Sequence, residues 1–155
     1  MADKSDPTVY TSPISRYTGS VDTLVMLCSQ HDIREQAAGF LRDSLGILSY
    51  YSIVVPGGPE FFLGSALSVY RQAGVRWAGF LAEHAELNKV VCIGHAACRW
   101  YGYHHGPQNA DTETFSDLYT IRGRVRYLCP DRTIDVRAYY ARWSSEGYLE
   151  FVQIS

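Results

Sequence analysis

The chain has 155 residues, of which 46% are hydrophobic and 19% are charged, and its formal net charge at pH 7 is −2. This composition is typical of a soluble globular protein, and the weak negative charge gives no reason to expect binding to nucleic acid or to an anionic membrane. No apolar run reaches the roughly 18 residues that a membrane-spanning helix needs. The sequence therefore predicts a soluble chain that is long enough to bury a core.

The first 20 residues are polar and contain Pro7, Pro13 and Gly19, without the apolar core of a signal peptide. We predict that residues 1–20 form an arm, either disordered or packed on a partner subunit, and that residues 21–155 form a single domain. Two of the four cysteines have the spacing of metal ligands, which suits a reducing compartment better than a disulfide framework does. The predicted location is therefore cytoplasmic.

Strands and helices alternate along the rest of the chain. Short apolar runs bounded by polar or glycine-containing turns predict strands over residues 23–28, 50–55 and 89–94. Helical spacing of apolar residues predicts helices over 34–45, over 61–87 with a break at Gly74 or Gly79, and over 112–128. Residues 102–109 are predicted to form a loop, and strands over 133–143 and 148–154 are joined by a Ser-Ser-Glu-Gly turn. This pattern predicts an α/β fold of three layers, in which a mostly parallel central sheet carries helices on both faces and ends in an antiparallel hairpin.

Two of the predicted strands lead into residues that bind soft metals. The strand 89–94 is followed by His95 and Cys98, which one turn or the start of a helix would aim at one point. The strand 23–28 ends in Cys28. Ligands gather at the carboxyl ends of strands in open α/β sheets, so the three residues could form a Cys₂His set, the ligand count of a catalytic zinc site. Taken singly, each could instead be an ordinary core residue, which is the interpretation we give to Cys92 and Cys129.

The order of these residues resembles the β-carbonic anhydrases, and most of all a short, divergent branch of that family. The family pattern is a Cys after the first strand and a Gly-His-x-x-Cys after a later strand, which Cys28, His95 and Cys98 match. The Pro-Gly-Gly segment at 56–58 resembles the glycine-rich loop of the branch, and residues 138–142 and 150–151 resemble its last strands. The resemblance implies that these three residues hold Zn²⁺. It also implies a lyase that hydrates carbon dioxide to bicarbonate through a zinc-bound hydroxide.

One part of the family pattern is displaced. The family has Asp two residues after the first Cys and Arg four residues after it, whereas this chain has Gln30 and Asp32 there. The Asp-x-Arg spacing recurs two residues later, as Asp32 and Arg34. If the turn after Cys28 bulges, Asp32 could orient the water on zinc and Arg34 could hold Asp32. Otherwise Asp32 caps the next helix, Gln30 faces the metal and Arg34 points outward, and we favour this second arrangement.

Several alternatives stay open. The same zinc site could act on carbon disulfide or carbonyl sulfide, or the chain could be a catalytically inactive zinc-binding assembly protein. His31 is expected to be solvated, and His104 and His105 are either exposed loop residues or a proton shuttle. The substrate pocket is expected to be narrow and apolar, with Phe61, Phe62 and the loop around Pro56 as candidates. Twelve tyrosines and the family resemblance predict a homodimer or a higher homo-oligomer.

Overall fold

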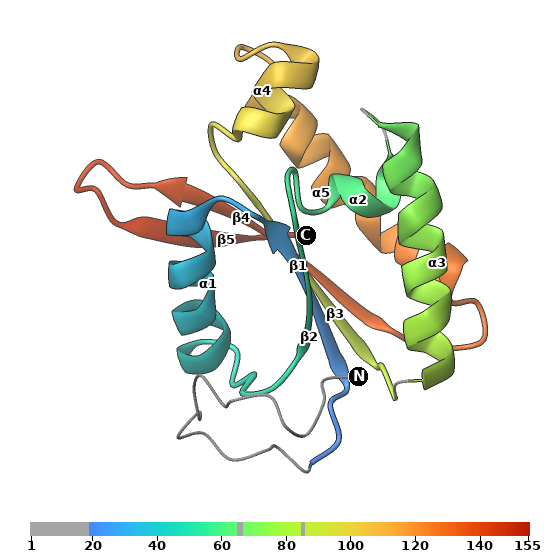
Figure 1. Ribbon diagram of the computed structural model, residues 1–155. Helices are drawn as coiled ribbons and strands as arrows, with labels where there is room; N and C mark the ends of the chain where they lie inside the picture. The colour runs from blue at the N-terminus through green and yellow to red at the C-terminus, as the bar shows by residue number, and fades with distance from the viewer. Residues whose placement is uncertain (1–18, 65–66, 85) are drawn as a thin grey trace, which may run out of the picture.

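A computed structural model describes residues 19–64, 67–84 and 86–155 of the chain (Figure 1). Within these residues, helices and strands follow one another in an α/β order. The elements are β1 (Thr23–Cys28), α1 (His31–Asp43), β2 (Tyr51–Val55), α2 (Glu60–Leu63), α3 (Ser68–His84), β3 (Lys89–His95), α4 (Arg99–His105), α5 (Ala110–Leu128), β4 (Asp135–Trp143) and β5 (Leu149–Ile154).

The strands form one five-stranded sheet in the order β2-β1-β3-β4-β5. The first four strands are parallel, and β5 returns antiparallel to β4. Every residue of β1 is buried, as expected for a central parallel strand that is covered on both faces. The predicted fold class is confirmed, including the mostly parallel sheet and the closing hairpin.

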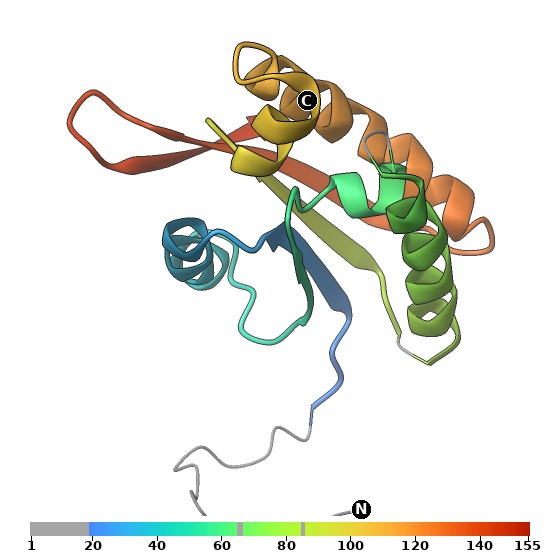
Figure 2. The same cartoon turned by 45° about the horizontal axis from the view of Figure 1, so that its top comes forward.

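Helices cover both faces of the sheet (Figures 1 and 2). On one face α1 packs Ala37 and Leu41 against Val25 and Val91. On the other face α2, α3 and α5 surround a larger core. That core contains Met26, Phe62, Val90, Cys92, Leu118, Ile121 and Cys129, among others. The alternation of successive strand residues between the two clusters is the two-residue period of a strand, and it makes three layers.

Two helices differ from the sequence prediction. The helical stretch predicted over 61–87 with a break forms two helices, α2 and α3, but the break begins at Gly64, directly after α2, rather than at Gly74 or Gly79. Gly64 has φ 63°, a left-handed conformation that glycine adopts without a steric penalty. The loop predicted over 102–109 is partly helical, because α4 starts directly after Cys98 and continues to His105. Its Tyr101 hydroxyl donates to Asp117 of α5 at 2.5 Å, a tertiary contact that local sequence cannot show.

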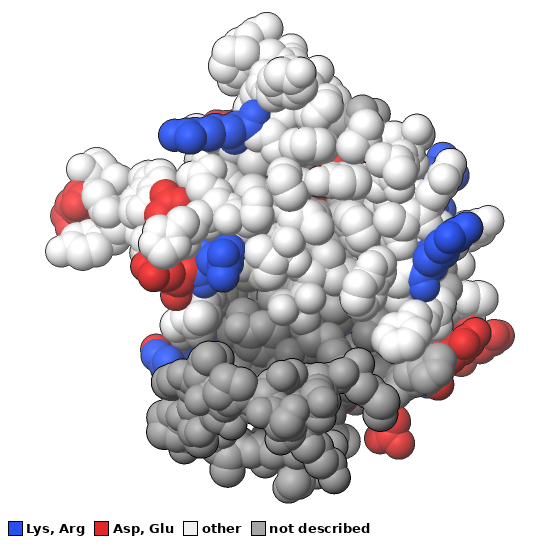
Figure 3. Space-filling view, viewed as in Figure 1, with Lys and Arg blue, Asp and Glu red and all other residues white. Residues whose placement is uncertain are grey.

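The chain ends and the surface add three observations. The predicted arm, residues 1–20, lies outside the described residues except for its last two. No helix of the part that the structure describes has both the length and the hydrophobicity to cross a bilayer. The face seen in Figure 3 carries Lys, Arg, Asp and Glu side chains in scattered positions, with no continuous basic patch on that face.

Candidate metal centre

Cys28, His95 and Cys98 come together at the carboxyl end of the sheet. Strands β1 and β3 are parallel neighbours, so their last residues lie side by side. The three side chains are buried, and their donor atoms all lie within 4.8 Å of one another. The two sulfur atoms are 3.9 Å apart. Zinc–sulfur bonds of about 2.3 Å at a tetrahedral angle place two sulfurs about 3.8 Å apart, so this spacing fits a shared zinc ion.

The orientation of the His95 ring leaves one nitrogen for a metal. Nδ1 lies 2.9 Å from the Ala96 carbonyl oxygen. A carbonyl only accepts, so Nδ1–H donates, and in the neutral imidazole Nε2 carries the lone pair. Nε2 is buried and has no hydrogen-bond partner among the residues that the structure describes. Leaving a buried polar atom unpaired costs about 1–3 kcal/mol, which a metal–nitrogen bond at that atom would offset.

The turn between His95 and Cys98 is held in a strained shape. The Ala96 N–H donates to the Ala141 carbonyl of β4 at 2.8 Å. Ala97 has φ 52°, a left-handed conformation that costs a residue with a Cβ about 1–2 kcal/mol. Its N–H donates to the Asp111 carboxylate of α5 at 2.8 Å. These two hydrogen bonds hold the turn, which brings the Cys98 thiol back beside His95.

The glycine-rich loop after β2 supports Cys28 from the other side. Gly58 has φ 51° and lies against the backbone of β1, so that a Cβ there would come 2.7 Å from the Cys28 nitrogen. A Cβ on Gly57, at φ 80°, would come 2.3 Å from the Trp100 indole. Only residues without a side chain fit between the Cys28 backbone and this indole. The Pro-Gly-Gly segment is therefore explained by packing around the candidate ligand.

The protonation of the two thiols is linked. A hydrogen bond from the Cys98 thiol lowers the pKa of Cys28 to about 4. The same interaction, together with burial, raises the pKa of Cys98. Burial alone would lower the pKa of His95, but the negative charge of the Cys28 thiolate close to the ring outweighs burial and raises it. At neutral pH the metal-free site therefore already holds one thiolate, and a binding metal ion would displace the proton of the second thiol.

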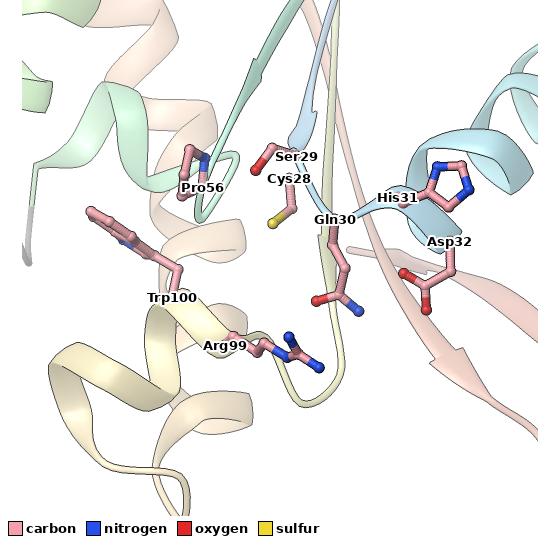
Figure 4. A pocket seen from close by; sticks show the side chains of 8 residues that line it. All are labelled: Cys28, Ser29, Gln30, His31, Asp32, Pro56, Arg99 and Trp100. Carbon is pink, nitrogen blue, oxygen red and sulfur yellow. The ribbon is translucent and has the colours of Figure 1, made fainter.

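A cavity of about 540 Å³ opens over Cys28 (Figure 4). It is lined by Cys28, Ser29, Gln30, His31, Asp32, Pro56, Arg99 and Trp100. Phe61 and Phe62, which the sequence suggested as pocket residues, are buried in the core and are not in this lining. Pro56 does line the cavity. The wall is more polar than the narrow apolar pocket that we expected.

The structure separates the three residues predicted to assist catalysis. Gln30 and Asp32 line the cavity, and in Figure 4 the Gln30 side chain lies between Cys28 and Asp32. Helix α1 begins at His31, so Gln30 is its N-cap residue and Asp32 belongs to its first turn. Arg34 is exposed and lines a different depression, beside Tyr50 and Ser52. Residues two apart on a helix do not face each other, which explains why Asp32 and Arg34 diverge.

Sequence reasoning missed Arg99 and Trp100 as cavity residues. They directly follow Cys98, and this proximity in sequence was the available signal. The Trp100 ring stacks on Tyr70, with ring centroids 5.1 Å apart, and also contacts the tilted ring of His104, whose centroid is 4.3 Å away. His104 and His105 lie on α4 and are not in the cavity lining, whereas His31 is in it and lies 3.5 Å from Glu35.

Comparisons with known proteins agree with the fold. No family model matches the sequence, and no curated protein matches it. The structure is similar to a solved structure of the wild-type β-carbonic anhydrase CafD from the filamentous fungus Aspergillus fumigatus, with a TM-score of 0.53 and 11% identity. The match covers 94% of this chain and 95% of that one. The chain therefore has a fold like that of a β-carbonic anhydrase, with a candidate Cys₂His metal centre at the carboxyl end of its sheet.

Proposed function

We propose that the chain is a zinc-dependent lyase that hydrates carbon dioxide to bicarbonate. The observation that carries the proposal is the convergence of Cys28, His95 and Cys98, with the buried Nε2 of His95 unpartnered among the described residues and with a sulfur spacing that suits zinc. Thiolates and an imidazole are ligands that zinc prefers, and three protein ligands leave the fourth position of a tetrahedral site open. The similarity to the CafD structure supports the same assignment through the fold.

When bound by these three residues, zinc would supply a coordinated water of lowered pKa. Two thiolates would neutralise the charge of the ion and so weaken its effect on the pKa of that water. Residues on the cavity wall would then be needed to orient the water and to accept its proton. Gln30 is placed to orient the attacking water by a hydrogen bond from its amide. Asp32 accepts the Ile33 N–H with Oδ1 at 3.1 Å, which leaves Oδ2 to accept a proton or hydrogen bond from the cavity. Trp100 and Pro56 supply the apolar part of the wall, against which a neutral linear substrate would lie.

A second candidate is a zinc-binding assembly protein without catalytic activity. The observation in its favour is that Arg34 lies away from the cavity, so that no Asp32–Arg34 ion pair forms within the described residues. The cavity is also large enough for carbonyl sulfide or carbon disulfide, so hydrolysis of these sulfur analogues is the alternative reaction at the same centre.

Stopped-flow measurement of carbon dioxide hydration by zinc-loaded protein separates these proposals. We expect a rate well above that of buffer, and loss of that rate in the Cys98→Ser variant. Protein that carries about one zinc per chain and gives no rate above buffer with carbon dioxide would reject carbon dioxide hydration, and the absence of a rate with the sulfur analogues as well would favour the assembly protein. Parallel assays with carbonyl sulfide and carbon disulfide identify the sulfur reaction if the carbon dioxide rate is absent.

A further inference from the structure

The cavity over Cys28 contains a cation that the sequence analysis did not assign. Arg99 is the first residue of α4, directly after Cys98. In Figure 4 its side chain extends toward Gln30, at the opening where Cys28 and Asp32 also lie. Of the eight labelled lining residues, Arg99 is the one with a permanent positive charge. Its backbone is fixed close to the candidate ligand, so its charge is held near the site.

The guanidinium of Arg99 is available to a ligand. Several other arginines of the described chain have partners: Arg137 donates to Asp135, Arg142 to Glu150, and Arg122 to the Ile154 carbonyl. The Arg99 guanidinium has no hydrogen bond or ion pair to any residue that the structure describes, including Asp32 on the same cavity. An exposed arginine without a protein partner is ordinary on an open surface. Here its donors instead face a cavity that contains the candidate metal centre.

The proposed zinc centre would have no net charge, so another cation in the cavity is needed to bind an anion. A zinc ion with two thiolates and a neutral imidazole has no net charge, so the centre would attract an anion weakly. The reaction proposed above forms an anion, bicarbonate, in the same cavity. A guanidinium presents a planar pair of N–H donors that matches the two oxygens of a carboxylate-like group. Gln30 adds an amide donor beside it, and Asp32 adds an acceptor.

We propose that Arg99 is the anion-binding residue of the cavity. Its guanidinium holds bicarbonate by donating a pair of hydrogen bonds to two bicarbonate oxygens. This inference rests on the proposed function for the identity of the anion. The hydroxyl of bicarbonate donates to the Asp32 carboxylate, and Gln30 donates to a bicarbonate oxygen. Nitrate has the same planar shape and charge but no hydroxyl, so it leaves Asp32 without a donor. The cavity therefore prefers bicarbonate to nitrate.

Isothermal titration of zinc-loaded protein with bicarbonate, at an alkaline pH where bicarbonate is the main dissolved species, tests the proposal. We expect Arg99→Gln to weaken binding on the order of tenfold or more, because a charged, two-point contact is lost. Arg99→Lys keeps the charge without the planar pair of donors, so the bicarbonate affinity of this variant should lie between those of the unmodified protein and of Arg99→Gln. Arg126→Gln is the matched control, since Arg126 is an exposed arginine in the last turn of α5, and we expect it to bind like the unmodified protein.

Three outcomes would overturn the inference: no bicarbonate binding by the unmodified protein, equal affinity in Arg99→Gln and the unmodified protein, or an equal loss in Arg126→Gln. Zinc content and circular dichroism of each variant show whether the centre and the fold are intact, and Arg99→Lys supplies the comparison if Arg99→Gln does not fold. The protein and the bicarbonate solution are both equilibrated with dissolved carbon dioxide beforehand, so interconversion of carbon dioxide and bicarbonate adds no net reaction heat to the heat of binding. Bicarbonate binding through Arg99 in a protein that does not hydrate carbon dioxide would reject the proposed function and support this inference.

Discussion

Replacing Gly58 by alanine tests whether the loop after β2 fixes the position of Cys28. Two costs follow from the structure. An alanine at φ 51° pays the left-handed penalty of about 1–2 kcal/mol. Its Cβ would also lie 2.7 Å from the Cys28 nitrogen, so backbone must move, at the cost of about 1–3 kcal/mol typical of overpacking. We therefore expect Gly58→Ala to lower the free energy of unfolding by about 2–5 kcal/mol, from the sum of these two terms.

Gly46→Ala is the matched control for this change. Gly46 has φ 67°, and no atom lies within 4 Å of the place where its Cβ would be. Gly46→Ala therefore incurs the left-handed penalty alone, and the effect of alanine on the unfolded chain is the same in both variants. Urea denaturation of the zinc-loaded proteins measures both, and competition with a chromophoric chelator measures zinc affinity, which should fall only in Gly58→Ala. Equal destabilisation and equal zinc affinity in the two variants would refute the packing argument.

Three further predictions concern the thiolate, the cavity wall and the assembly. The pKa of Cys28 is depressed from 9.0 to about 4, so the metal-free fold gains stability as pH rises above about 4. The raised pKa of His95 opposes this only above about 6.5. Urea denaturation of the metal-free proteins from pH 4 to 6.5 should show a smaller gain in the free energy of unfolding for Cys28→Ser than for the unmodified protein. An equal gain would contradict a thiolate at Cys28. Asp32→Asn should lower carbon dioxide turnover by about 10²-fold at unchanged zinc content, and full turnover would exclude Asp32 as a proton acceptor. Sedimentation at micromolar concentration should show at least a dimer, and a monomer would contradict the predicted oligomer.

The strands and the ligand set could be predicted because their signals are local and repeated. Short apolar runs marked β1 and β3, and the structure has β1 at the predicted residues Thr23–Cys28. Parallel strands place their carboxyl ends at one edge, so residues 67 or more positions apart in sequence could be expected to meet there. That rule links Cys28 to His95 and Cys98, whose donor atoms the structure brings together.

Helix α4, the direction of Arg34 and the place of Arg99 in the cavity could not be predicted from the sequence, because they depend on tertiary contacts and on where helix α1 begins. Helix α4 has seven residues and contains Gly102. The Tyr101 hydroxyl of this helix donates a hydrogen bond to Asp117 of α5, a residue 16 positions away in sequence. Short helices gain most of their stability from such packing rather than from local propensity. The direction of Arg34 depends on α1 beginning at His31, a boundary that sequence patterns place only approximately. Arg99 could not be assigned to the cavity before the path of α4 was known.

The most direct test of the central claim is the metal content and metal ligation of the purified protein. Metal analysis should give about one zinc per chain, and X-ray absorption at the zinc edge should show two sulfur ligands at about 2.3 Å together with nitrogen. Cys98→Ser should lose most of the zinc and melt at a lower temperature, because metal binding links two strand ends. Cys129→Ser, at a buried thiol outside the candidate ligand set, should keep its zinc. Full zinc retention in Cys98→Ser would contradict the proposed metal centre.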